Sequence, residues 1–131
     1  MVDALRSARR ALRSGGTLID LRPDASRPPR LIVGGRVLGR LAGSAASQVD
    51  DTAADGAVAS LVDAGLLRRV ARGHLWYSTT YASLAEVDAY VRVGRRWDGY
   101  ARGSRAALLP FSRGPIVSRR SVRFEVLQRL R

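Results

Sequence analysis

Arginines interleaved with aromatic residues are the side chains with the clearest chemical potential in this sequence. Arginine binds phosphates and carboxylates through several N–H donors, and aromatic rings stack on nucleobases. One group precedes Trp76, and a second is interleaved with Trp97 and Tyr100. Because contacts to phosphate carry no base information, we expect any nucleic-acid binding through them to be weak and independent of sequence. The candidate anion-binding residues are Arg68, Arg69, Arg72, Arg92, Arg95, Arg96, Arg102 and Arg105.

Three further residues are candidates for ligand binding, and each also has a structural interpretation. Asp20 falls near the end of an expected strand, where α/β sheets bind their ligands, or it serves as a cap in the following loop. His74 is the only histidine and lies beside an expected turn, where it is either a ligand or a surface residue. Trp76 either stacks on a nucleobase or forms a cation–π pair with Arg69 across that turn.

The sequence lacks the residue sets that common catalytic or metal sites require. Cysteine is absent, which excludes disulfides, thiolate metal sites and cysteine nucleophiles and suits a cytoplasmic protein. A single histidine offers no second imidazole for a metal, and no Gly-x-Ser-x-Gly motif occurs. We therefore expect no bound cofactor, no metal and no catalysis by this chain alone. We also expect no signal peptide and no membrane span, because no apolar run approaches roughly 18 residues.

The net charge of +12 indicates anionic partners. All 23 basic residues are arginine, a pattern that GC-rich coding can produce. Such coding does not explain why the arginines outnumber the 11 acidic residues about twofold. Residues 41–65 contain four acidic residues and no arginine, whereas both flanks are basic. This asymmetry favours binding to a polyanion or an acidic protein, or self-association.

Hydrophobic spacing and turn residues predict a helix, a strand and a hairpin near the start of the chain. Apolar residues follow one helical face over residues 2–12, and Gly15-Gly16 supplies the positive φ that ends a helix. Residues 17–21 form a short apolar strand that we expect to be buried. A proline-rich loop spans residues 22–30, and Gly34-Gly35 marks a two-residue hairpin turn.

The middle of the chain is expected to contain a loop, a helix and a second hairpin. Small polar residues predict a loop over residues 43–50, and a capping-box pattern starts a helix over residues 52–64. Residues 66–70 and 74–80 should then pair around Arg72-Gly73 as two strands.

The last part of the chain should add a helix, a loop and a long strand. A second capping box begins a helix at Ser83, and Gly94 ends it. We expect a loop with a short helix over residues 94–114 and a strand over residues 116–130. Together the elements predict a single α+β domain covering residues 1–131, with two hairpins and three helices packed against a mostly antiparallel sheet.

Three segments resemble the C-terminal half of class I methyltransferases, which use S-adenosylmethionine. Residues 4–23 are similar to the late helix, glycine turn and following strand, residues 57–66 to a helix ending in Ala-Gly-Phe, and residues 121–130 to the last strand. The family's cofactor site lies mainly in its N-terminal half, in a Gly-rich loop and an acidic residue. Neither has a counterpart before Leu5, so no cofactor-binding residue can be assigned here.

This resemblance implies a non-catalytic interaction or accessory domain, such as the partner subunit of a separate methyltransferase. A half-sheet standing alone leaves strand edges and an apolar face exposed, and exposed edges invite pairing. We therefore expect a homodimer or a heteromeric complex with another protein.

Residues 57–80 also resemble the helix and wing of winged helix-turn-helix proteins, which place a helix in the major groove and a basic hairpin on the backbone. This alternative makes the chain a nucleic-acid-binding protein. The expected recognition helix carries Asp55 and Asp63 but no arginine, so it would repel phosphate. A third alternative is a small enzyme acting on an anionic metabolite, for which no general acid–base pair is evident.

Overall fold

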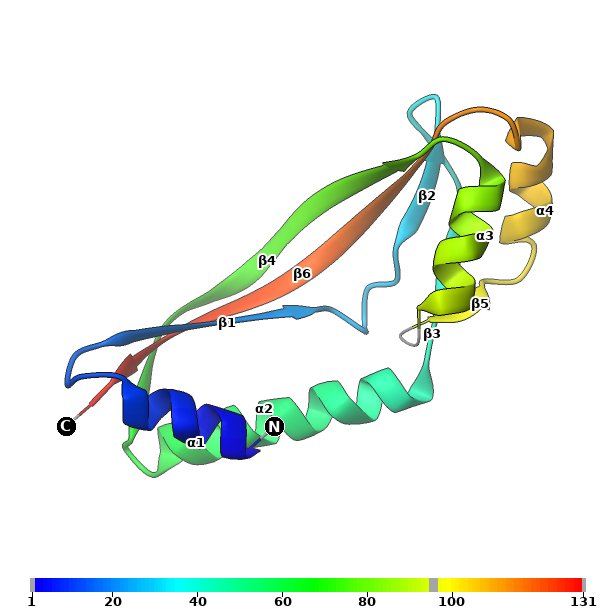
Figure 1. The fold of residues 1–131 in the computed structure, drawn as a ribbon. Coiled ribbons are helices and arrows are strands. Elements are labelled where there is room, and N and C mark those ends of the chain that lie inside the picture. The colour runs from blue at the N-terminus through cyan, green and yellow to red at the C-terminus, as the bar shows by residue number, and fades with distance from the viewer. Residues whose placement is uncertain (1, 95–96, 131) are drawn as a thin grey trace. The chain divides into compact units, whose positions relative to one another are not determined.

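A computed structural model describes residues 2–94 and 97–130 of the chain. Over these residues the fold is α+β, as predicted, with a six-stranded, mostly antiparallel sheet and four α-helices (Figure 1). The strand order is β1-β6-β2-β3-β5, and β4 pairs with β6. None of the helices in the described ranges is long and apolar enough to cross a membrane. The elements are α1 (Val2–Ala11), β1 (Thr17–Pro23), β2 (Arg30–Val33), β3 (Arg36–Gly43), α2 (Ala45–Asp63), β4 (Leu67–Tyr81), α3 (Leu84–Val93), β5 (Trp97–Tyr100), α4 (Ser104–Leu108), a 3₁₀ turn (Leu109–Phe111) and β6 (Ile116–Arg129).

The chain divides into two compact units, each with its own core. The terminal unit comprises Met1–Pro23, Val49–Leu75 and Val122–Arg131, and the inner unit comprises Asp24–Gln48 and Trp76–Ser121. Helix α2 and strands β4 and β6 each contribute residues to both units. The predicted ligand-binding residues are therefore divided, because Asp20 and His74 belong to the terminal unit and Trp76 belongs to the inner unit.

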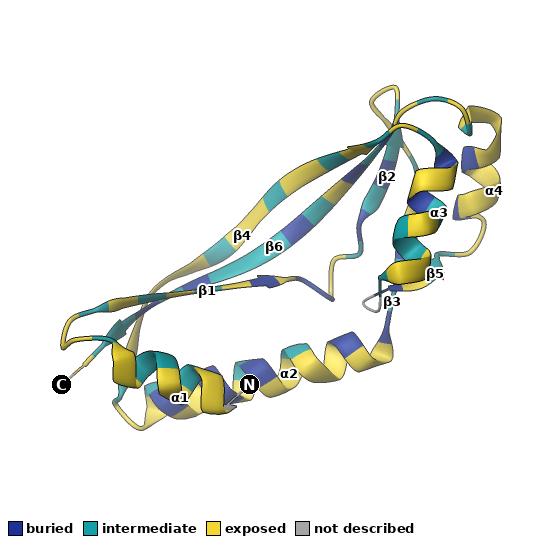
Figure 2. Ribbon diagram, in the orientation of Figure 1, coloured by how far each residue is buried: buried dark blue, intermediate teal, exposed yellow. Residues whose placement is uncertain are grey.

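In the terminal unit, β1 pairs antiparallel with β6 over its whole length. Successive side chains of a strand point to opposite faces, and Leu18 packs against the core whereas Ile19 and Leu21 are 59% and 57% exposed (Figure 2). The expectation of a buried strand is thus wrong, because only one of the two faces of β1 is covered. The core consists of Val58, Leu61, Leu67 and Leu127, with Leu5, Leu18, Val62 and Leu66 packed against it.

In the inner unit, β2 and β3 form the predicted two-residue hairpin. Both turn glycines have positive φ, 54° and 78°, as a type I′ turn requires. The pairing contains one irregularity, since Ile32 lies opposite Val37 but Leu31 lies opposite Gly39. Leu38 is therefore the extra residue of a β-bulge.

Helix α3 covers the core of the inner unit and begins as predicted. The Ser83 hydroxyl accepts a hydrogen bond from the Glu86 N–H at 3.4 Å, and the Glu86 carboxylate accepts one from the Ala82 N–H at 2.7 Å. These two hydrogen bonds fix the start of the helix, on which Leu84 and Val87 are buried in the core. The core of the inner unit consists of Leu31, Leu41, Leu84, Val87, Trp97, Leu108 and Ile116.

Helix α2 begins at Ala45, so the loop expected over residues 43–50 is wrong. The Ser44 hydroxyl accepts a hydrogen bond from the Ser47 N–H at 3.0 Å, which makes Ser44 an effective N-cap. Small residues that resemble a loop by composition continue a helix once such a cap is present. The expected start at Thr52 consequently lies inside the helix.

The second hairpin is also wrong, because β4 runs as one continuous strand through Arg72 and Gly73. Gly73 does not adopt the positive φ that a two-residue turn needs. The Phe124 ring occupies the space beside it, since a Cβ on Gly73 would lie 3.0 Å from two ring atoms. This glycine therefore makes room for an aromatic ring on the neighbouring strand rather than forming a turn.

Residues 94–114 contain more structure than the loop and short helix predicted. The short helix is confirmed as α4, but strand β5 precedes it and pairs with β3, with Tyr100 opposite Leu41 and Trp97 opposite Gly43. With α4 counted, the described residues contain four α-helices rather than three. The long strand predicted over residues 116–130 is confirmed as β6.

Replacing Gly39 by alanine should lower the free energy of unfolding by about 1–3 kcal/mol. A Cβ at Gly39 would lie 2.8 Å from the Cβ of Ser104, and the Ser104 hydroxyl is held in place because it accepts the Arg40 N–H at 2.9 Å. Gly56→Ala is the matched control, since a Cβ there meets nothing within 4 Å and alanine stabilises a helix interior by roughly 0.5–1 kcal/mol. Urea unfolding followed by circular dichroism measures both, and a Gly39→Ala variant as stable as the parent would contradict the close packing.

Candidate anion-binding site

Three arginines lie directly opposite one another on adjacent strands of the inner unit. Arg30 on β2 lies opposite Arg40 on β3 and also opposite Arg119 on β6. Opposed residues of an antiparallel pair share one face of the sheet, with Cβ atoms about 4.5–5.5 Å apart. Because the neighbouring Leu31 and Leu41 are buried in the core, the three arginines lie on the face away from that core. Arg30, Arg40 and Arg119 are together termed the arginine row.

Trp76 on β4 lies beside the arginine row. The Arg30 Cζ is 4.9 Å from the centroid of the Trp76 ring, and the Arg119 Cζ is 5.6 Å from it. Both distances allow cation–π attraction, which orients the two guanidinium groups and offsets part of their mutual repulsion. The cation–π pair expected with Arg69 is wrong, because Arg69 and Trp76 lie on the same continuous strand instead of facing each other across a hairpin.

A cavity of about 210 Å³ is lined by two members of the row, Arg30 and Arg40. It is smaller than the roughly 300–1,000 Å³ typical of drug-sized ligand sites, so it suits a phosphate group or one part of a larger ligand. The proline-rich segment before β2 forms one of its walls. The lining residues are Ser26, Arg27, Pro28, Arg30, Arg40 and Trp76.

The arginine row carries positive charge that the described part of the chain does not neutralise. No carboxylate in these ranges forms an ion pair with a member of the row, whereas Arg27 at the cavity pairs with Asp24 at 3.5 Å. Like charges directly opposite one another destabilise a sheet. An anion placed between them would replace repulsion with charge-assisted hydrogen bonds. Because guanidinium groups stay protonated, the row is suited to binding anions and not to proton transfer.

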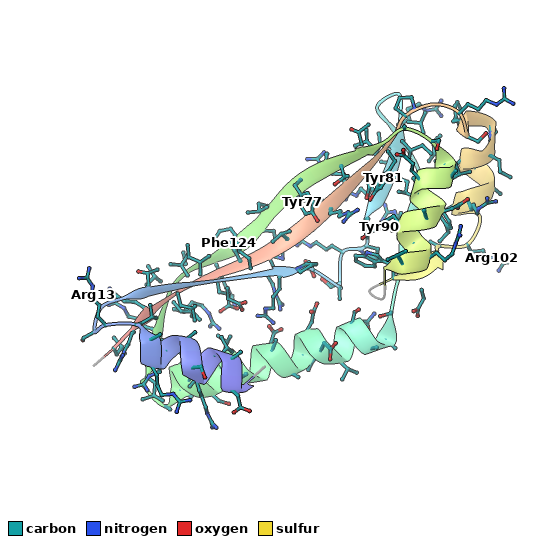
Figure 3. The ribbon with its side chains drawn as sticks, viewed as in Figure 1. Arg13, Tyr77, Tyr81, Tyr90, Arg102 and Phe124 are labelled. Carbon is teal, nitrogen blue, oxygen red and sulfur yellow. The ribbon has the colours of Figure 1, made fainter. Side chains whose placement is uncertain are left out.

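Arg120, the residue after Arg119, contacts Tyr77, Tyr81 and Tyr90, which Figure 3 labels in the inner unit. Its guanidinium donates hydrogen bonds to the hydroxyls of Tyr77 and Tyr81, and its Cζ lies 4.3 Å from the centroid of the Tyr90 ring. Burial raises the pKa of the Tyr81 hydroxyl, which keeps this partner neutral. Since adjacent residues of a strand point to opposite faces, anchoring Arg120 also directs Arg119 to the side of the arginine row.

Asp20 lies in the terminal unit as part of a charged network. The Arg22 Nε is 2.9 Å from Asp20 Oδ2, and another guanidinium nitrogen of Arg22 is 3.0 Å from Asp55 Oδ1. Arg123 on β6 donates to both carboxylate oxygens of Asp55. These four side chains join β1, α2 and β6, and Asp20 acts there as the ion-pair partner of Arg22.

The arginines predicted near the start of β4 lie in the terminal unit and contact neighbouring strands. Arg68 donates to Gln128 Oε1 at 2.6 Å, and the Arg69 Nε donates to Glu125 Oε2 at 2.8 Å. Arg72 and His74 lie further along the same strand. These residues belong to a different unit from the arginine row, so the structure gives two separate groups of basic side chains.

The arginines predicted over residues 92–105 lie in the inner unit, on and around α3 and α4. Arg92 is in the last turn of α3, Arg102 is in the loop before α4 (Figure 3), and Arg105 is on α4. Arg105 forms two hydrogen bonds with the Asp88 carboxylate. Arg95 and Arg96 lie outside the described residues.

Asp88 should make the stability of the inner unit depend on pH. Hydrogen bonds from Arg105 and from the Tyr100 hydroxyl, the latter at 2.6 Å, hold the Asp88 pKa below its ordinary value of about 4. A lowered pKa means that the stabilisation is present above pH 4 and is lost as the pH falls through the folded-state pKa. Asp88→Asn should therefore unfold at lower urea concentration than the parent at pH 7, with the difference shrinking by pH 3. A difference that stays constant over this range would show that the carboxylate charge is not responsible.

The arginine row is not evident from the local sequence because long-range pairing creates it. A regular two-residue hairpin would place Arg30 opposite Gly39, and only the bulge brings Arg40 into that position. The pairing of β2 with β6 joins Arg30 to Arg119, which lies far along the chain. The surplus of arginine over acidic residues was the one signal that pointed to such a surface.

The comparisons with known proteins give no family for this chain. Within residues 2–94 and 97–130, no group of three or more histidine, aspartate or glutamate side chains could hold a metal ion. The donors of the arginine row are cationic and therefore suit an anion rather than a metal or a metal-bearing cofactor. No protein-family model matches the chain, and no curated protein or solved structure matches it.

Proposed function

We propose that the inner unit binds single-stranded nucleic acid through the arginine row and Trp76. The observation that carries this proposal is the alignment of three arginines on adjacent strands, none of which pairs with a carboxylate of the described residues. The net charge of +12 adds a general attraction to polyanions. This function corresponds to the arginine-rich nucleic-acid-binding alternative from the sequence, with a different set of arginines.

A polymeric anion suits the row better than a small one. Strands are about 4.8 Å apart, so three opposed arginines extend over about 10 Å and can contact more than one phosphate. The cavity of about 210 Å³ is too small to enclose a nucleotide, but it can take one phosphate of a chain that continues across the sheet.

A single strand suits the arginine row better than a duplex. Unpaired bases can stack on aromatic side chains and on guanidinium planes, and the row offers both. A duplex is read by a helix or a two-stranded ribbon that enters a groove, whereas the members of the row lie side by side on three paired strands of a sheet. Contacts of this kind track the phosphate backbone and carry little base preference.

Fluorescence anisotropy with labelled oligothymidine and oligoadenosine at several salt concentrations tests the proposal. The two oligonucleotides should bind with similar affinity. This affinity should fall steeply as the salt concentration rises, because phosphate contacts release counterions. A duplex of the same length should bind more weakly. If oligothymidine or oligoadenosine did not bind at low salt, the proposal would be refuted.

A second proposal is the accessory role implied by the methyltransferase resemblance. The exposed Ile19 and Leu21 on β1 support it, because apolar residues at a sheet edge are common at protein contacts. This role predicts a dimer or a complex that survives high salt, and no binding of S-adenosylmethionine by the chain alone. Light scattering of the purified protein at low and high salt distinguishes it from nucleic-acid binding, which salt weakens.

A further inference from the structure

A second cavity, of about 300 Å³, lies in the terminal unit between α1 and the end of α2. Its walls differ in character. Leu61, Ala64 and Leu66 contribute apolar surface, and α1 contributes Arg6, Arg9 and Arg10. The cavity therefore combines an apolar wall with a cationic rim, a combination that neither nucleic-acid binding nor the terminal core requires.

The arginines of this rim have no acidic partner in the described ranges. None of the three forms an ion pair with a carboxylate, and the hydrogen bond from Arg10 to the Ser7 hydroxyl is long, at 3.4 Å. The Nε of Arg9 is buried without a hydrogen-bond partner. A buried donor without an acceptor is unfavourable, so an anion in the cavity would supply what this nitrogen lacks.

We infer that this cavity binds an amphipathic monoanion, a medium-chain fatty carboxylate in its free form. The carboxylate would accept hydrogen bonds from the arginines of α1, and the alkyl chain would lie against Leu61, Ala64 and Leu66. A cavity of about 300 Å³ lies at the lower end of the roughly 300–1,000 Å³ typical of small-molecule sites, so it suits a small ligand. Octanoate, with eight carbons and two oxygens, has this size.

The shape of the ligand follows from the two walls. A phosphate chain would leave the apolar wall without a partner, and a purely apolar molecule would leave the Arg9 Nε unsatisfied. A two-chain membrane lipid exceeds the volume. The site is independent of the arginine row, because it belongs to the other unit and shares no residue with it.

Isothermal titration calorimetry of the full chain with octanoate, acetate and octanol tests the inference. Octanoate should bind about tenfold or more tightly than acetate, which lacks the chain, and than octanol, which lacks the charge. Equal binding of octanol would show that the arginines recognise no anion. Equal binding of acetate would show that the apolar wall is not used. Either result would overturn the inference, and so would binding to vesicles of anionic phospholipid without binding to octanoate.

Two variants locate the site. Ala64→Phe fills the cavity from an exposed position and should abolish octanoate binding while leaving the circular dichroism spectrum and melting temperature unchanged. Arg9→Gln should weaken binding about tenfold, whereas Arg13→Gln removes the same charge from an exposed position beyond α1 and should not. Unchanged binding by Ala64→Phe would place the ligand elsewhere and overturn the assignment.

Discussion

Replacing Arg22 by methionine is expected to lower the free energy of unfolding by about 3 kcal/mol. Arg22 is 8% exposed, and its guanidinium contacts the carboxylates of Asp20 and Asp55 at 2.9 and 3.0 Å. It also donates to the backbone carbonyl of Asp51 at 3.3 Å. Methionine fills a similar volume but leaves the Asp20 carboxylate, itself mostly buried, without a counter-charge.

The expected loss lies at the lower end of the range for broken buried ion pairs because Asp55 keeps a second partner, Arg123. Urea unfolding at pH 7 measures the change. Arg72→Met is the matched control, since Arg72 lies exposed in the same unit and should change stability by less than about 0.5 kcal/mol. Adding Asp20→Asn to Arg22→Met should recover part of the loss by removing the uncompensated charge. A loss below about 1 kcal/mol for Arg22→Met would mean that the network is not important for stability.

Replacing Arg30 and Arg119 by glutamine should weaken binding of single-stranded nucleic acid about a hundredfold. Each charge-assisted hydrogen bond to phosphate contributes about 1.5 kcal/mol, or about tenfold in affinity. The slope of log affinity against log salt should become shallower by about 1.4, because each phosphate contact on a single strand contributes about 0.7.

The same double variant should not destabilise the protein. Both arginines lie in a row of opposed like charges, so their removal relieves repulsion even though it also removes cation–π contacts with Trp76. Lower affinity together with unchanged unfolding is the result that separates a binding role from a structural one.

The control is a double variant at Arg92 and Arg102, also changed to glutamine. It removes the same charge from the same unit. Arg92 and Arg102 are candidates from the sequence but are not members of the arginine row. If nucleic-acid binding depends on the arginine row, this variant should bind almost as well as the parent. If instead the Arg92 and Arg102 variant loses affinity and the Arg30 and Arg119 variant does not, the site is the one predicted from the sequence.

Local signals predicted those parts of the fold that neighbouring residues determine. The two-residue turn at Gly34-Gly35 and the capping box of Ser83 and Glu86 are confirmed, because each depends on residues within four positions of one another. Arg72-Gly73 resembles a turn equally well by composition. There the chain continues as one strand, and the Phe124 ring, about fifty positions away in the sequence, occupies the space beside Gly73.

The candidate site could not be predicted in the same way. Trp76 was identified from its residue type, but its partners Arg30 and Arg119 come from strands that are separated in sequence from it and from each other. The expected burial of β1 is wrong for a related reason, since Ile19 and Leu21 are apolar yet nothing in their local sequence shows that one face of the strand is left uncovered. Which strands lie side by side, and which faces are covered, depends on pairing between distant parts of the chain. The spacing of apolar residues along one strand does not reveal it.

The bulge at Leu38 changes which residues of β3 face each side of the sheet. The chemistry of one face follows from that change. Leu38 and Leu41 are three positions apart and would point to opposite sides of a regular strand, yet both pack on the core. The extra residue makes this possible and sends Arg40 to the side that carries Arg30. If β3 paired without the bulge, with Leu38 opposite Leu31, the two sides of the rest of the strand would be exchanged, so that Leu41 would lie on the side of Arg30 and Arg40 would face the core. The positive face of the inner unit is thus encoded by one unpaired residue as much as by the arginines themselves.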